Sequence, residues 1–365
     1  MGSFPRLLVL IVLSGVLLGP HAAVAQLPAA TGRQLALSDP AWKLFVPSTY
    51  EQRPGRVADL LVHFHGDPQT VWNNALAADL NALIVTVNYP GLSSAYTGPF
   101  SDAGLFQTLI NDALATARGQ RDLPSDLEWD AVAVSSFSAG YGAVRQVLKT
   151  PAYVEQIDAV LAADSLYATT AGDGTPLDSQ MVDYKAFADL AAAGEKTFLF
   201  SHSQVPTFTY ESTLETGDEL LDHLGVLAGP YRKAGLGTLQ FYRSAESGKF
   251  RLWGATGEDG DAHLAHLRYI AEFFGELPIA RLPNHAGDVD GDGDADLGDL
   301  LRWQRDEAQA AWGGSVLTDW RARVVEDGAA VSVALVPEPS GLAMCSALLP
   351  TLAMRAVRRC RLQPR

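Results

Sequence analysis

Ser138 stands at the apex of a strand, tight turn and helix pattern. The apolar run 129–135 precedes it, and the stretch 141–149 after it has helical character. A serine hydroxyl is a poor nucleophile unless a sharp turn lifts it clear of the sheet and exposes it to a base and to backbone donors. Gly140 supplies the small residue needed on one side, and Ser136 stands where a glycine is usual on the other. The pattern predicts a nucleophilic serine.

The base that activates such a serine is expected after it in the chain, in the order serine, acid, histidine. Among the eight histidines, His263 fits best, because it follows the Gly- and Asp-rich loop 254–261 and lies at the start of the last long helix. A base on a loop edge can reach over the end of the sheet. His266, one helical turn further on, is the alternative.

The acid that orients the histidine is predicted to be Asp164, which ends the strand 159–163. The carboxyl ends of parallel strands are where open sheets place their sites. An Asp that merely caps the following turn would look the same in the sequence. Three other carboxylates follow the next strand and occupy the more usual place for this acid: Glu211, Glu215 and Asp218.

Two backbone amides are expected to stabilise the negative charge that develops on the substrate oxygen. One is the amide of Ala139, directly after the serine. The other is expected from the loop after the first clear strand, where Gly66 permits close approach of the backbone and Asp67 or a near neighbour donates. The side chains of His63 and His65, on one strand face by parity, are expected to be packed polar residues.

The elements that position these residues alternate between short apolar runs and longer stretches of helical period, from about residue 42 to 277. This alternation predicts an α/β fold with a doubly wound, mostly parallel sheet. The expected strands are 60–64, 83–88, 131–135, 159–163, 197–201 and 239–243. The expected helices are 105–117, 142–149, 184–193, 219–227 and 262–274.

Residues 26–282 resemble an α/β-hydrolase, on the turn 136–140, the loop residues His65 and Gly66, and His263 before the terminal helix. The resemblance implies a serine hydrolase, an esterase in first place, that uses no cofactor and acts on a small-molecule or polysaccharide-linked ester. The family also contains peptidases, lipases and noncatalytic members. A noncatalytic extracellular binding or adhesion protein is therefore the alternative.

The N-terminus predicts export, and the negative net charge argues against nucleic acid as a partner. Arg6, the apolar run 7–18 and Ala23-Val24-Ala25 predict a signal peptide over residues 1–25 that signal peptidase removes. An uncleaved membrane anchor is the alternative. The formal net charge is −15, and both cysteines lie near the C-terminus, at 345 and 360. Such a chain repels phosphates and has no disulfide in its body.

An acidic loop in a separate module, residues 283–328, has the spacing of a calcium site. Aspartates occupy positions 1, 3, 5, 7, 9 and 12 of a loop whose sixth residue is Gly293, and hard oxygen ligands at this spacing wrap Ca²⁺. They are Asp288, Asp290, Asp292, Asp294, Asp296 and Asp299. With the following helix 300–306, the loop resembles one dockerin repeat, which implies structural calcium. A dockerin has two repeats, so a scaffold partner is an open question, and a solvated Asp/Gly linker is the alternative.

The tail 329–365 contains Pro337-Glu338-Pro339, a moderately apolar stretch 341–354 and a cluster of arginines from Arg355. It resembles a PEP-CTERM sorting signal, which implies recognition and cleavage by an exosortase. The apolar stretch is a poor bilayer span by itself, and the arginines would hold the end on the cytoplasmic side. The tail and the leader together predict a protein of the cell envelope or the extracellular space.

Overall fold

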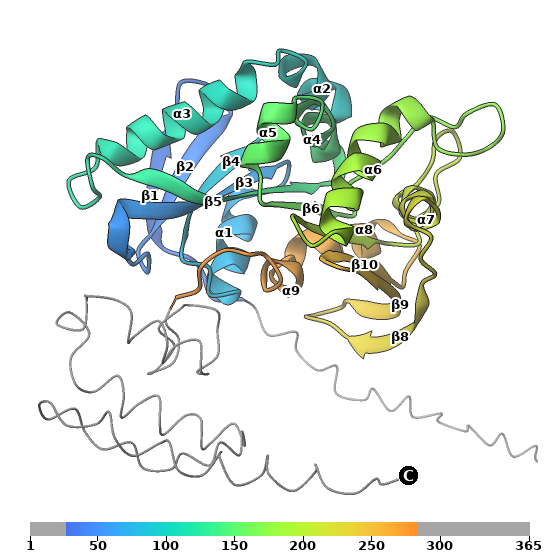
Figure 1. Ribbon diagram of the computed structural model, residues 1–365. Helices are drawn as coiled ribbons and strands as arrows, with labels where there is room; N and C mark the ends of the chain where they lie inside the picture. Colours follow the sequence, from blue (N-terminus) through green and yellow to red (C-terminus); the bar gives the residue numbers. More distant parts are fainter. Residues whose placement is uncertain (1–26, 283–365) are drawn as a thin grey trace, which may run out of the picture.

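A computed structural model describes residues 27–282 and contains one sheet of ten strands (Figure 1). Six central strands run parallel, in the order β4-β3-β5-β6-β7-β10, and antiparallel strands continue the sheet at both edges, β1-β2 on one side and β9-β8 on the other. The strands are β1 Gly32–Ala36, β2 Trp42–Pro47, β3 Val57–Phe64, β4 Ala82–Val87, β5 Glu128–Phe137, β6 Ala159–Ala163, β7 Thr197–His202, β8 Gly229–Ala234, β9 Gln240–Ser247 and β10 Phe250–Ala255.

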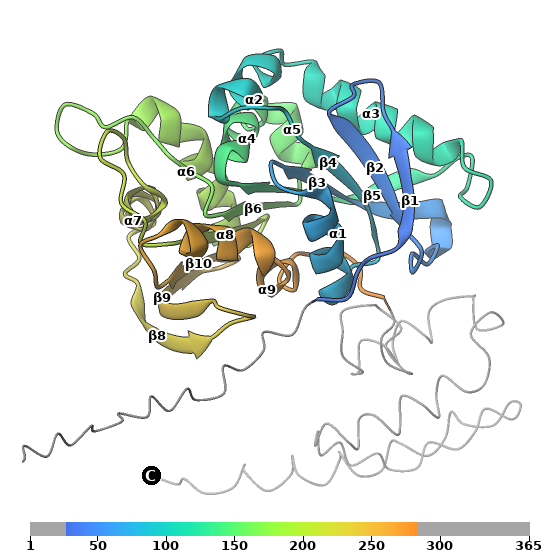
Figure 2. The ribbon, with the colours of Figure 1, turned by 180° about the vertical axis from the view of Figure 1, so that it is seen from behind.

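Helices cover both faces of this sheet (Figures 1 and 2). One hydrophobic cluster includes residues of α2, α3, α4, α6 and α7, and a second includes residues of α1, α8 and α9. The helices are α1 Pro68–Ala77, α2 Ser93–Phe100, α3 Leu105–Arg118, α4 Tyr141–Val147, α5 Pro151–Gln156, α6 Asp178–Ala192, α7 Thr213–Leu224, α8 Gly260–Arg268 and α9 Ala271–Phe274, with short 3₁₀ turns η1 Pro54–Arg56 and η2 Ser138–Gly140.

The central strands are apolar because both of their faces are covered. Every residue of β4, β6 and β7 is buried, and in β3 only Val57 is partly exposed. Parallel strands in this position read as continuous runs of Val, Leu, Ile and Ala rather than as an alternation. The sheet can therefore fix the positions of the loops that follow the carboxyl ends of its parallel strands.

All six predicted strands are confirmed, with ends shifted by up to four residues. Four strands have no counterpart in the prediction: β1, β2, β8 and β10. Strands β1 and β8 lie at the two edges of the sheet and are largely exposed, so neither shows an apolar alternation. The predicted strand 239–243 is the antiparallel β9, and β10 is the sixth strand of the parallel part of the sheet.

Three of the helix predictions need correction. The helix expected over 184–193 begins six residues earlier, at Asp178. The single helix expected over 262–274 is two helices, α8 and α9, since Tyr269 ends α8 outside the helical conformation. The helix expected over 219–227 begins six residues earlier, where Ser212 and Glu215 form a reciprocal cap, and ends at Gly225 with a left-handed backbone. Helices α1, α2 and α5 were not predicted.

The signal peptide, the six aspartates of the calcium loop and the sorting tail lie outside the described residues. Within residues 27–282, no helix combines the length and the apolar character that a membrane crossing needs. In the same range, no group of three or more His, Cys, Asp or Glu side chains is arranged to hold a metal ion.

Candidate active site

Ser138 lies where β5 ends and the turn η2 begins, at the carboxyl edge of the parallel strands. Its φ of 47° is unusual for a residue with a side chain. Backbone strain of this kind costs on the order of 1–3 kcal/mol and persists only where the surrounding structure holds it. Ser138 is partly exposed, whereas Ser135, Ser136 and Phe137 before it are buried. The turn therefore brings this one serine to the surface.

Close packing of the turn against β3 explains the need for Gly140. A Cβ atom at position 140 would lie 2.2 Å from the backbone oxygen of Phe64. The Ser165 hydroxyl donates to the backbone oxygen of Ser138 at 2.9 Å, and its Oγ lies 2.8 Å from Ser136 Oγ. The serine that replaces the usual first glycine is thus a hydrogen-bonding partner inside the turn.

Asp164 and His263 lie 99 residues apart in sequence, and their side chains meet at this edge. The His263 Nδ1–H donates to Asp164 Oδ2 at 2.7 Å. The other carboxylate oxygen accepts from the Ser203 amide at 2.9 Å and from the Thr213 hydroxyl. Asp164 is fully buried, and the ring of His263 is mostly buried. The bond to Nδ1 leaves Nε2 of His263 as the nitrogen available to a substrate or a nucleophile.

The surroundings of Asp164 keep it ionised. Burial by itself raises the pKa of a carboxyl, but the positive charge available at His266 and His263 and the hydrogen bonds from His263 and Thr213 lower the pKa of Asp164 below its usual value. A carboxylate that stays charged beside an imidazole stabilises the imidazolium that forms when the ring takes up a proton. The pair has the electrostatic character of a base and its orienting acid.

Phe137 connects this pair to the serine turn. Its ring stacks on the ring of His263 with centroids 4.6 Å apart, and Ser138 is the next residue. Phe137 also stacks with His65, with ring centroids 6.2 Å apart. The hydrogen bonds among the described residues do not include one between the Ser138 hydroxyl and His263. Catalytic hydrogen bonds are often long before substrate binds.

The alternatives to Asp164 and His263 have other partners. Asp218 forms an ion pair with Arg243 at 2.6 Å, Glu215 caps α7 through Ser212, and Glu211 pairs through its backbone with Ala168. His266 is fully buried, and its Nδ1 lies 2.8 Å from Ser201 Oγ. Burial lowers the pKa of His266 below its usual value. Among the carboxylates considered, only Asp164 has a hydrogen bond to His263.

Of the three amides considered as donors to the substrate oxygen, one already has a partner within the protein. The amide of Gly66, at φ 133°, already donates to the Asn88 side chain at 3.0 Å. The side chain of Asp67 caps α1 by accepting from the Thr70 amide at 2.8 Å. Neither the Asp67 amide nor the Ala139 amide donates to another protein group among the described residues. Asp67 and Ala139 are therefore the amides still available, and Gly66 shapes the loop.

The two early histidines differ from each other, contrary to the expectation that they share a strand face. His63 is fully buried in β3, where it contacts Ser135 Oγ and the backbone oxygen of His65, and burial lowers the pKa of His63 to about 3. His65 follows the end of β3 at φ 69°, and its Nδ1 lies 2.9 Å from Tyr96 Oη. The strand ends between them because the backbone turns into the Gly66 loop.

Three residues beside the site were missed in the sequence: Phe137, Ser203 and Thr213. Phe137 and Ser203 directly adjoin the carboxyl ends of parallel strands, so the rule that singled out Asp164 could have found them. Thr213 opens a helix whose start was not predicted and carries no signal of its own.

Comparisons with known proteins add likenesses of overall structure alone. No family model matches the sequence, and no curated protein matches it significantly. A mutant of the feruloyl esterase module from Clostridium thermocellum, complexed with sinapinate, is 12% identical, with 71% of this chain and 93% of that chain covered and a TM-score of 0.39. The poly(3-hydroxybutyrate) depolymerase LpqC from Bordetella parapertussis is 16% identical, with 69% and 92% covered and a TM-score of 0.37. At these scores the likenesses support no conclusion about activity or ligand.

Proposed function

We propose that the protein is a serine hydrolase of the α/β-hydrolase type, an esterase, in which Ser138 is the nucleophile, His263 the base and Asp164 the orienting acid. The observation that carries the proposal is the buried Asp164–His263 bond of 2.7 Å, next to the ring of Phe137 and thus beside the strained serine. Strain at a polar residue and a buried carboxylate–imidazole pair occur together at sites that activate a nucleophile.

In the first half of the reaction, Ser138 Oγ forms a bond to the ester carbonyl carbon as its proton passes to His263 Nε2. The amides of Ala139 and Asp67 stabilise the negative carbonyl oxygen of the tetrahedral intermediate. The bond to the alcohol oxygen then breaks, and the alcohol leaves with the proton from His263. An acyl group remains on Ser138.

In the second half, water takes the place of the alcohol. His263 accepts a proton from the water as its oxygen bonds to the acyl carbon, and the carboxylic acid departs when the bond to Ser138 Oγ breaks and the serine regains its proton. Asp164 keeps its charge throughout and holds the imidazole in the tautomer with a proton on Nδ1. No cofactor takes part in these steps.

Hydrolysis of short p-nitrophenyl esters tests the proposal. We expect Ser138→Ala to lose activity by roughly 10⁴-fold or more, and Ser125→Ala, in an exposed turn before β5, to retain it. A fluorophosphonate should label the wild type at Ser138, as located by mass spectrometry of the modified peptide. Equal, slow hydrolysis by wild type and Ser138→Ala, with no label, would support the noncatalytic binding protein instead.

The remaining parts of the chain complete the proposal. A leader of residues 1–25 is removed on export, residues 283–328 fold around structural calcium, and the tail 329–365 is processed by an exosortase at the cell envelope. The substrate is a small-molecule or polysaccharide-linked ester, and nucleic acid is not a partner. Calorimetric titration of the full chain with CaCl₂ tests the module, because Asp292→Ala should remove the binding heat if the loop holds the ion.

A further inference from the structure

A cavity of about 490 Å³ is lined by residues of α2, by residues of α4 and by the segment after β6. Tyr141, one helical turn after Ser138, lines it, as does Tyr167, whose hydroxyl donates to the backbone oxygen of Asp164 at 3.4 Å. Tyr210 and residues of α2 complete the wall. The size is within the range of pockets that enclose small organic ligands.

Arg145 is the one charged side chain among the residues that line this cavity. It is 9% exposed, and one of its terminal nitrogens donates to the backbone oxygen of Tyr167. Its guanidinium carbon lies 4.8 Å from the centroid of the Tyr141 ring. Tyr167 and Tyr141, which also line the cavity, therefore fix the orientation of the Arg145 guanidinium.

This arginine forms no ion pair within the described part of the chain, and its buried Nε has no hydrogen-bond acceptor. The carboxylate that its charge influences is Asp183, where burial raises the pKa of the carboxyl and the charge of Arg145 partly opposes that rise without an ion pair. A buried charge without a counterion is costly, and charged side chains in protein interiors are nearly always paired. In a chain of net charge −15, a buried arginine that forms no ion pair and lies beside a cavity points to an anion from outside the chain.

We propose that this cavity binds a carboxylate carried by the ester substrate, with Arg145 as the specificity-determining residue and the tyrosines as the walls for an apolar or aromatic spacer. This rests on the proposed esterase function. A guanidinium presents paired N–H donors that match the two oxygens of a carboxylate. The acidic surface disfavours anions in general, so recognition depends on contacts inside the cavity.

Two matched substrates test the inference: p-nitrophenyl hexanoate and p-nitrophenyl hydrogen adipate, which differ by a terminal carboxylate. We expect Arg145→Met to lower the ratio of kcat/KM for the adipate over the hexanoate by about 10- to 100-fold, the range for a hydrogen bond to a charged group. Arg145→Lys should restore part of the ratio because it keeps the charge. The matched control is Arg232→Met, which removes an exposed positive charge on β8 and should leave the ratio as in the wild type.

A binding measurement separates this inference from the proposed reaction. In the Ser138→Ala protein, calorimetry with phenylbutyrate and its neutral amide should show tighter binding of the carboxylate, and adding Arg145→Met should abolish the difference. Should the wild type hydrolyse neither ester while the carboxylate still binds through Arg145, the anion site stands and the esterase proposal fails. A ratio and a binding difference that Arg145→Met leaves unchanged overturn the inference.

Discussion

Two buried aspartates lie at opposite ends of the parallel strands, and their pKa values are shifted in opposite directions. Asp164 follows β6 at the carboxyl edge and is held by His263, Ser203 and Thr213. Asp59 is near the start of β3, at the other edge. The pKa of Asp164 is lowered, whereas burial raises the pKa of Asp59 even though Arg53 and two backbone amides partly oppose it.

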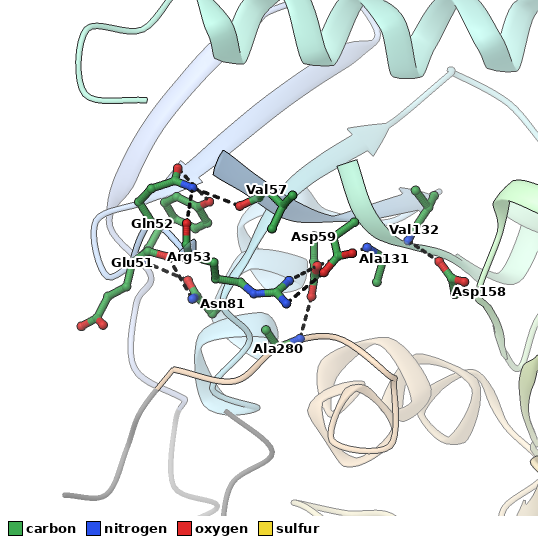
Figure 3. A network of polar contacts seen from close by, with 12 residues as sticks. Glu51, Gln52, Arg53, Val57, Asp59, Asn81, Ala131, Val132, Asp158 and Ala280 are labelled. Carbon is green, nitrogen blue, oxygen red and sulfur yellow. Dashed lines mark hydrogen bonds and ion pairs between the residues drawn. The ribbon is translucent and has the colours of Figure 1, made fainter. Parts of the chain in front are cut away.

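The partners of Asp59 tie the chain together, as the close view shows (Figure 3). Its carboxylate accepts from Arg53 at 2.5 Å, from the Ala280 amide at 2.7 Å and from the Ala131 amide at 3.2 Å. Arg53 also pairs with Asp130 at 2.9 Å. The cluster thus joins β3, β5 and the end of the described chain. Ala280, which donates to Asp59, is 221 residues away from it in sequence.

The comparison teaches that burial alone does not define a functional carboxylate. Around Asp59, the hydrogen-bond donors to the carboxylate are Arg53 and two backbone amides, none of which exchanges a proton near neutral pH. At the Asp164 edge, one partner is an imidazole with a second nitrogen free to exchange a proton. We therefore expect substitution of Asp164 to lower activity and substitution of Asp59 to lower stability.

Asp164→Asn should have the largest effect. An amide in place of the carboxylate cannot stabilise the imidazolium and favours the wrong tautomer of His263, so kcat should fall about ten thousandfold. The measurement is p-nitrophenyl ester hydrolysis by protein shown by circular dichroism to be folded. Activity within tenfold of the wild type would remove Asp164 from the mechanism.

Asp59→Asn should give the converse result. One of the three donors around the carboxylate loses its acceptor, which lowers the free energy of unfolding by about 1–3 kcal/mol. Urea unfolding measures this change, and kcat/KM of the folded protein should stay within about threefold of the wild type. A large loss of activity without a loss of stability would show that the two edges are coupled.

Gly140→Ala tests how tightly the serine turn is held against β3. The added Cβ would meet the Phe64 oxygen at 2.2 Å, and overpacking of this kind typically costs about 1–3 kcal/mol of unfolding free energy. Gly172→Ala is the matched control, because an added Cβ there meets nothing within 4 Å. Equal stability of the two variants in urea would mean that the turn can shift away from β3.

The pH dependence of stability reports on the buried histidines. Burial lowers the pKa of His63 and of His202 to about 3, with the charge of Arg243 adding to the effect at His202, and burial also lowers that of His266. The unfolded chain therefore binds more protons than the folded one below the ordinary histidine pKa of about 6.5. The free energy of unfolding is highest above that pH and falls by up to about 1.4 kcal/mol per pH unit for each of His63 and His202 towards pH 3, and His266 contributes in the same direction.

Asp59 contributes with the opposite sign, since its raised pKa adds stability at low pH that is lost as the pH rises through the folded value. Urea unfolding at pH 7.5, 6 and 5 measures the sum. Glutamine at position 63 can keep one donor and one acceptor. His63→Gln should therefore reduce the slope of the unfolding free energy against pH by the contribution of one histidine. A stability that stays flat between pH 7.5 and 5 would contradict the assignment of these histidines as neutral in the folded state.

Much of the central sheet could be predicted because buried parallel strands are continuous apolar runs. The strand 159–163 has the predicted ends, and the serine turn was visible from its small residues. Strands β1 and β8 could not be predicted, because an exposed edge strand has no apolar alternation and is defined by its pairing with β2 or β9. The break between α8 and α9 likewise has no marker such as proline or glycine at Tyr269.

By itself, the sequence determined the α/β architecture, the serine at the strand-to-helix turn and the order of a carboxylate and a histidine after it, because these depend on local patterns. Only the tertiary structure decided that Asp164, rather than Glu211, Glu215 or Asp218, bonds to His263. It also stacked Phe137, the residue before Ser138, on the imidazole of His263 and left Arg145 without an ion pair beside a cavity. A contact such as that between Asp164 and His263, 99 positions apart, depends on how the strands are ordered in the sheet, and the spacing along the chain does not encode that order.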